Sequence, residues 1–195
     1  MIKDQDFEYE RFTGLSITEQ TIENCHFTDC EFIDCSFENC EVRRCSFSEC
    51  IFKGCRINAI KPLHCHIRSS DFAECRLIGV NWNQWITPNQ FSAPFSTITN
   101  CRMKYNNFME MNLIKTDFSG CTITESLFGE CRLAESSFNS CELSGTEFFK
   151  CDISKADFRN SVGYKIDIAT NKMKGARFSF PEAINLLAGL GISIE

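Results

Sequence analysis

Residues 25–39 read Cys25-His-Phe-Thr-Asp, Cys30-Glu-Phe-Ile-Asp and Cys35-Ser-Phe-Glu-Asn. Each five-residue unit has a cysteine first, a phenylalanine third, and mostly polar or charged residues elsewhere. A period of five fits neither the 3.6-residue period of an α-helix nor the two-residue alternation of a β-strand. A chain that turns a corner every five residues would instead aim each central side chain at one common axis. The stretch therefore predicts a solenoid.

The five-residue period fills most of the 195 residues. An apolar centre residue recurs from Phe7 to Trp82, with Pro62 as an exception, and again from Ile98 to Phe178, with Gly163 as an exception. All 14 cysteines lie two residues before a centre, so we expect them to be buried beside the core as unreactive thiols. The phenylalanines predicted to form the core are Phe27, Phe32, Phe37, Phe47, Phe52, Phe72, Phe108, Phe118, Phe128, Phe138, Phe148 and Phe158.

These units match the pentapeptide consensus of Ala or Cys, a polar residue, Leu or Phe, and two variable positions. The sequence resembles the pentapeptide-repeat family over about residues 5–180. That family folds as an all-β, right-handed quadrilateral parallel β-helix with four units per coil. The resemblance implies about eight coils within residues 1–180 and, at about 4.8 Å per coil, a rod about 40 Å long. Each coil can bury its apolar side chains only against its neighbours.

Composition favours a folded protein without a membrane segment. Hydrophobic residues make up 43% and charged residues 24% of the chain, which is typical of folded domains. No run approaches the roughly 18 apolar residues of a membrane helix, and the charged first residues do not resemble a signal peptide. We therefore expect a cytoplasmic protein with reduced thiols. The sequence has no nucleophile–base pair, phosphate loop or cofactor motif, so we expect neither catalysis nor a cofactor.

His64, Cys65 and His66 invite interpretation as a metal site. Alternate residues of an extended segment point to opposite sides, so Cys65 points away from the two histidines. No fourth ligand lies nearby, and we therefore expect no metal at this position.

The phase of the repeat changes once, in residues 83–97. Trp82 and Ile98 are 16 positions apart, one more than three units need, and two prolines lie between them. The segment is either a bulge that absorbs the inserted residue or an exposed loop that contacts a partner. Its candidate partner-binding residues are Trp85, Phe91 and Phe95, which would anchor a contact if exposed and plug the kink if buried.

Residues 181–195 depart from the period and predict a C-terminal helix and tail. Pro181 suits the first turn of a helix and Gly191 suits its end. A solenoid end leaves backbone groups unpaired, so we expect this helix to act as a cap. Its apolar surface also suits a two-fold dimer contact. The candidate interface residues are Ile184, Leu186, Leu187, Leu190 and Ile192.

Acidic residues are concentrated near the N-terminus. The net charge is −8 in residues 1–40, +3 in 41–100, +1 in 101–180 and −2 in 181–195. Net acidity and the lack of a recognisable basic patch argue against direct binding to nucleic acid. Duplex DNA carries about one charge per 1.7 Å, so this chain can mimic DNA by uniform charge only weakly.

Two segments are similar to the Qnr quinolone-resistance proteins and to microcin immunity proteins of the McbG kind. They are Phe-Ser-Ala-Pro-Phe-Ser-Thr-Ile at residues 91–98 and Leu-Leu-Ala-Gly-Leu-Gly-Ile-Ser-Ile at residues 186–194. The resemblance implies a homodimer, joined through its C-terminal ends, that binds DNA gyrase or topoisomerase IV. It also implies protection of that enzyme from quinolones or peptide toxins, partly by mimicry of DNA shape. The alternative is a non-enzymatic interaction scaffold or self-immunity factor with a different partner, because a fold does not fix a function.

Overall fold

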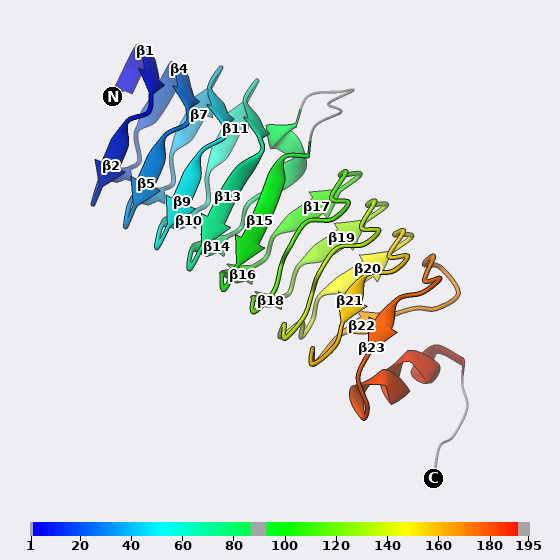
Figure 1. The fold of residues 1–195 in the computed structure, drawn as a ribbon. Coiled ribbons are helices and arrows are strands. Elements are labelled where there is room, and N and C mark those ends of the chain that lie inside the picture. The colour runs from blue at the N-terminus through cyan, green and yellow to red at the C-terminus, as the bar shows by residue number, and fades with distance from the viewer. Residues whose placement is uncertain (1, 87–92, 191–195) are drawn as a thin grey trace.

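The computed structural model describes residues 2–86 and 93–190, which form an all-β parallel solenoid of about nine turns (Figure 1). The predicted fold class is confirmed. Facing residues of neighbouring coils are normally 20 positions apart, as in the pair Arg11 and Glu31. Ile2 also pairs with Ile22, so the repeat begins one unit earlier than the sequence predicts. At about 4.8 Å per turn the rod is about 43 Å long.

Parallel strands stack along the sides of the rod. One six-stranded sheet continues around a corner, because two of its strands each span two units. Its strands are β1 (Ile2–Glu8), β4 (Thr21–Thr28), β7 (Glu41–Arg43), β8 (Ser46–Ser48), β11 (Lys61–Leu63) and β12 (His66–Arg68). The second six-stranded sheet contains β3 (Ser16–Thr18), β6 (Ser36–Glu38), β10 (Arg56–Asn58), β14 (Arg76–Ile78), β16 (Arg102–Lys104) and β18 (Thr122–Thr124).

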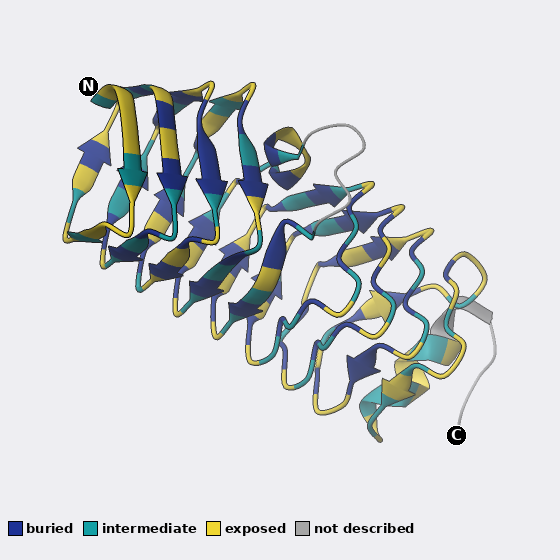
Figure 2. Ribbon diagram, turned by 45° about the horizontal axis from the view of Figure 1, so that its top comes forward, coloured by how far each residue is buried: buried dark blue, intermediate teal, exposed yellow. Residues whose placement is uncertain are grey.

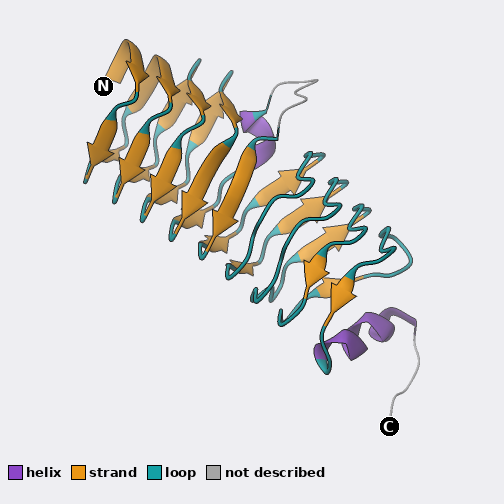
Figure 3. Cartoon of the chain, viewed as in Figure 1, coloured by secondary structure: helices purple, strands orange, loops and turns teal. Residues whose placement is uncertain are grey.

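The remaining strands complete the other sides. A five-stranded sheet contains β2 (Arg11–Thr13), β5 (Glu31–Ile33), β9 (Ile51–Lys53), β13 (Ser70–Ala73) and β15 (Phe95–Thr99). A four-stranded sheet contains β17 (Asn107–Met109), β19 (Leu127–Gly129), β20 (Glu147–Phe149) and β22 (Lys165–Ile166), and a last pair is β21 (Asp157–Phe158) with β23 (Arg177–Phe178). Two 3-10 helices, η1 (Trp82–Trp85) and η2 (Glu182–Leu190), lie at the break and at the C-terminal end (Figure 3).

Phenylalanine rings stack along the axis of the rod. The ring of Phe118 lies 4.8 Å from that of Phe138, and Phe128 lies 5.0 Å from Phe148, with nearly parallel planes. Rings from adjoining sides meet edge to face, as Phe128 meets Phe138 at 5.5 Å. All the phenylalanines predicted for the core are buried, and buried residues follow the inside of the coils (Figure 2). Each buried ring contributes about 1.5–3 kcal/mol of hydrophobic stabilisation.

Nearly every unit ends at a corner residue with positive φ, two positions after the centre. The φ angle is 52° at Asp29, 48° at Ala59 and 70° at Gly145. A residue other than glycine in this conformation costs about 1–2 kcal/mol, because its Cβ approaches the next carbonyl oxygen. In the C-terminal coils the N–H group three residues after the centre residue closes the turn. Thr116 N–H, for example, donates a hydrogen bond to the Leu113 carbonyl at 3.2 Å. The packing inside the rod must therefore offset a recurring backbone cost.

Replacement of Phe118 by alanine tests the stacked core. Phe118 is fully buried, so Phe118→Ala is expected to lower the free energy of unfolding by about 3–5 kcal/mol, because a cavity opens in the ring stack. The control is Tyr9→Ala, whose side chain is 79% exposed; we expect it to change stability by less than about 0.5 kcal/mol. Chemical denaturation followed by circular dichroism measures both. Equal losses would contradict the stacked core.

Candidate partner-binding site

The coil at the break is six residues longer than the others. Facing residues across the break, such as Cys75 and Cys101, are 26 positions apart, whereas Cys25 and Cys45 are 20 apart. The pairing of β13 with β15 also shifts register at this point. The sequence predicts one inserted residue, because an additional whole unit of five residues leaves the phase of the repeat unchanged. The insertion is one residue plus one unit.

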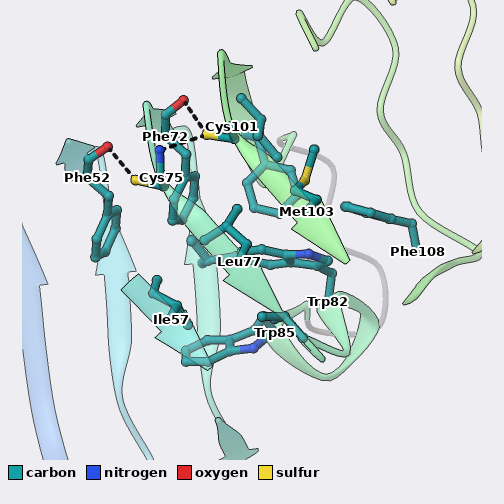
Figure 4. Close-up of a cluster of buried hydrophobic side chains, with 14 of the residues drawn as sticks. Phe52, Ile57, Phe72, Cys75, Leu77, Trp82, Trp85, Cys101, Met103 and Phe108 are labelled. Atoms are coloured by element: carbon teal, nitrogen blue, oxygen red, sulfur yellow. Dashed lines mark hydrogen bonds between the residues drawn. The ribbon is translucent and has the colours of Figure 1, made fainter. Parts of the chain in front are cut away.

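Trp85 and Phe95, two of the three candidate contact residues, are buried, with only 5% and 1% of their surfaces exposed. Both tryptophan side chains of η1 point into the rod, and Trp85 lies near Ile57 (Figure 4). The interpretation of Trp85 and Phe95 as exposed anchors is therefore wrong. Large aromatic rings gain more free energy inside the rod than at its surface. Phe91 lies outside the described residues.

Pro62 explains why the break supplies a tryptophan to the core. Pro62 stands at a centre position opposite Val42 and is only partly buried. Trp85 comes from the coil after Pro62, yet its ring lies 5.9 Å from Phe47, in the coil before Pro62. The Trp85 side chain therefore spans the coil that contains Pro62, where the proline places no large side chain in the core. An apolar cavity of about 30 Å³ remains in this region. Pro62 and Trp85, which belong to two separate irregularities in the sequence, are therefore parts of one packing arrangement.

Trp82 joins the two halves of the rod across the break. Its ring stacks on Phe108 at 6.0 Å, and its Nε1–H donates to Asn106 Oδ1 at 3.0 Å. Asn106 occupies a position that cysteine holds in other units, and its Nδ2 donates to the carbonyls of Leu77 at 2.8 Å and Lys104 at 3.1 Å. Polar bonds as well as ring packing therefore fix the geometry of the break.

A double-mutant cycle tests the link between Pro62 and Trp85. Trp85→Ala is expected to lower the free energy of unfolding by about 3–5 kcal/mol, because it empties part of the core. Pro62→Ile alone is expected to destabilise by about 1–3 kcal/mol, because the tryptophan ring already fills the space. In combination the isoleucine fills the space that alanine leaves, so the double variant is expected to lose less than the sum. Strictly additive losses in urea denaturation would show that the two residues do not share a space.

The cysteines form a buried lining beside the phenylalanine core. All 14 are free and buried. Except for Cys25, the thiols donate to backbone carbonyls of the preceding coil, as Cys141 Sγ does to Phe118 at 3.0 Å. Burial raises the pKa of Cys50 and of Cys141 to about 12. Thiols with such a pKa carry almost no thiolate at neutral pH and are poor nucleophiles.

Within residues 2–86 and 93–190, no group of three or more His, Cys, Asp or Glu side chains is placed to hold a metal ion. At the motif considered above, Cys65 is buried and His64 is exposed, so these side chains diverge. Burial lowers the pKa of His66, and the neighbouring His26 and Arg68 lower it further. Neither η1 nor η2 has the length and apolar character needed to cross a membrane.

The helix η2 covers the C-terminal end of the solenoid (Figure 1). Glu182 Oε1 accepts the backbone N–H of Gly163 at 2.9 Å, and Leu186 packs partly buried against the core. The helix is a 3-10 helix over Glu182–Leu190. It therefore contacts the last coils through both a polar and an apolar side chain.

The other predicted dimer residues differ in position. Ile184 and Leu187 are 38% and 36% exposed. The side chain of Leu190 and all of Ile192 lie outside the described part of the chain. Two apolar side chains of η2 are thus available at the end of the rod.

Sequence reasoning missed one basic surface. Arg56 pairs with Arg76, and Arg76 pairs with Arg102, so three arginines stack in successive coils. The expectation that the chain has no basic patch is therefore wrong. Each arginine directly precedes a centre residue, which is a visible signal, but the third lies beyond the break where the spacing changes from 20 to 26.

The family model for the pentapeptide repeat region matches residues 25–89 and 95–179. This chain belongs to the pentapeptide-repeat family. Among solved structures, this pentapeptide-repeat chain is similar to full-length QnrB1, a plasmid-mediated fluoroquinolone resistance protein. The identity is 21% and the TM-score 0.56, with coverage of 96% of this chain and 100% of that one.

A second structure, of a trypsin-treated QnrB1 variant, gives the same picture. It is 22% identical with a TM-score of 0.53, and covers 99% of this chain and 98% of that one. No curated protein matches this pentapeptide-repeat chain. At these identities the likeness to QnrB1 shows a shared fold.

Proposed function

We propose that this protein is a Qnr-like, non-enzymatic binding protein that occupies a type II DNA topoisomerase in the cytoplasm. In doing so it protects the enzyme from quinolones or peptide toxins. The observation that carries the proposal is the structural correspondence with QnrB1 along nearly the whole length of both chains. A filled rod with buried thiols also suits a protein that acts through its outer surface rather than through a reaction.

The N-terminal coils supply a surface that suits a DNA-binding enzyme. Asp6, Glu8 and Glu10 are exposed and form no ion pair with the described residues. The first 40 residues together carry a net charge of −8. Surfaces that bind DNA are rich in lysine and arginine, so an acidic end would be steered toward them. The rod shape extends the contact beyond the charged end.

The exposed apolar side chains at the other end favour a dimer. Phe180 is 81% exposed and lies two positions before the start of η2, where Ile184 and Leu187 are also exposed. An isologous contact between two such ends would bury these side chains. The acidic coils would then lie at both outer ends of the dimer.

Substitution in η2 tests the dimer. Ile184→Asp with Leu187→Asp is expected to give a folded monomer, because two buried charges would oppose the apolar contact. Ile51→Asp is the matched control, since Ile51 is an exposed apolar residue on β9, away from η2. Sedimentation velocity of the purified proteins measures the state. A wild type that sediments as a monomer, or a double variant that stays dimeric, would contradict this contact.

Supercoiling of relaxed plasmid by gyrase, at an inhibitory concentration of a fluoroquinolone, tests the function. The protein is expected to restore supercoiling when titrated from stoichiometric amounts to an excess. Combined Asp6→Asn, Glu8→Gln and Glu10→Gln is expected to require about tenfold more protein, because the acidic end is neutralised. The control is Glu110→Gln, Glu125→Gln and Glu147→Gln, which removes the same charge from the C-terminal half. No rescue at any ratio by folded protein would assign this chain to a different partner.

A further inference from the structure

We propose that one side of the rod binds a short acidic segment of a partner protein through an arginine ladder, formed by Arg56, Arg76 and Arg102. These residues lie on β10, β14 and β16, which are neighbours in one parallel sheet. The strand register places each arginine directly opposite the next, and all three are exposed. At about 4.8 Å between coils, the outer two backbones are about 10 Å apart.

The arginine ladder is unpaired within the described part of the chain. None of its three guanidinium groups has an ion-pair or hydrogen-bond partner there. On another side of the rod, stacked charges alternate in sign: Lys115 and Lys155 bind Glu135 at 3.8 Å and 3.6 Å. Like charges directly opposite in a sheet are destabilising. The ladder therefore costs stability in the free protein, and a bound anionic group would remove that cost.

The surroundings of the arginine ladder leave room for a ligand. The corner positions that follow the three arginines are Ala59, Gly79 and Tyr105, and a Cβ added to Gly79 would meet no atom within 4 Å. A hollow of about 220 Å³ lies between the first two arginines, with Asn58 and Ile78 in its lining. One further cation, Lys104, follows the third arginine on the same strand. An extended chain can approach the first two arginines past the small corner residues Ala59 and Gly79.

Acidic residues limit the ladder at both ends. Glu38 lies one coil before it, opposite Asn58, and also lines the hollow. Glu142 lies two coils beyond it, opposite Thr122. A long polyanion along the rod would meet both carboxylates, and the net charge of −6 would oppose it further.

A short acidic peptide fits these limits better than nucleic acid does. Alternate side chains of an extended peptide repeat at about 6.6 Å, so two or three carboxylates span the ladder. Arginine binds carboxylates through two parallel hydrogen bonds, which makes each such pair directional as well as charged. The occupant is therefore an extended segment with two or three alternating Asp or Glu residues.

A fluorescent peptide of alternating Glu and Ser is the probe, and its Gln-for-Glu counterpart is the control ligand. Fluorescence anisotropy is expected to show about tenfold tighter binding of the acidic peptide, weakening as salt is added. Arg56→Gln, Arg76→Gln and Arg102→Gln together are expected to weaken binding about tenfold, which three exposed ion pairs of modest strength would give. The control is Lys115→Gln, Arg132→Gln and Lys155→Gln, which removes the same charge elsewhere and is expected to leave binding unchanged within about twofold.

Thermal denaturation separates a lost contact from a lost fold. The ladder variant is expected to melt at or above the wild-type temperature, because the repulsion between stacked arginines is removed. Equal weakening in both triple variants would overturn the proposal. Tighter binding of a single-stranded oligonucleotide of equal charge would also overturn it and would assign the ladder to nucleic acid. These peptide measurements are independent of gyrase protection, so either proposal can fail without the other.

Discussion

The stacking of each coil on the next is the interaction on which the rest of the structure depends. A single coil buries little on its own, because the faces of its central rings are covered by the side chains 20 residues before and after them. The same contact offsets the backbone cost of a positive φ angle at nearly every corner. Residues that face outward take no part in this packing. The inward-facing residues therefore determine the fold, and the outward-facing residues determine the chemistry of the surface.

The fold and the core could be predicted because an apolar residue recurs at every fifth position, and each of these residues points inward. Phe118 and Cys141 need no tertiary information to be recognised as buried. The break could not be predicted in the same way. A phase of five does not distinguish one inserted residue from six, and nothing local to Trp85 indicates that Pro62 leaves space for its ring. Trp85 is buried because its ring fills the space that Pro62 leaves one coil away.

The surfaces proposed for binding differ in how visible they are in the sequence. The acidic N-terminal end is a property of consecutive residues, so it follows directly from Asp6, Glu8 and Glu10. The arginine ladder depends on which residues face each other, and that register is 20 positions before the break and 26 across it. In a solenoid, neighbouring residues on one side come from distant parts of the sequence. A local motif cannot reveal such a surface.

The seam formed by Pro62, Trp85 and Trp82 has a consequence for assembly of the rod. A chain of uniform units can pair out of alignment by a whole coil, because each coil would still find phenylalanine rings above and below it. Such a slip would carry Trp85 away from Pro62 and separate Trp82 from Asn106. Only one alignment of the two halves satisfies both tryptophans at once. The lengthened coil at the break therefore gives a repetitive chain one correct alignment.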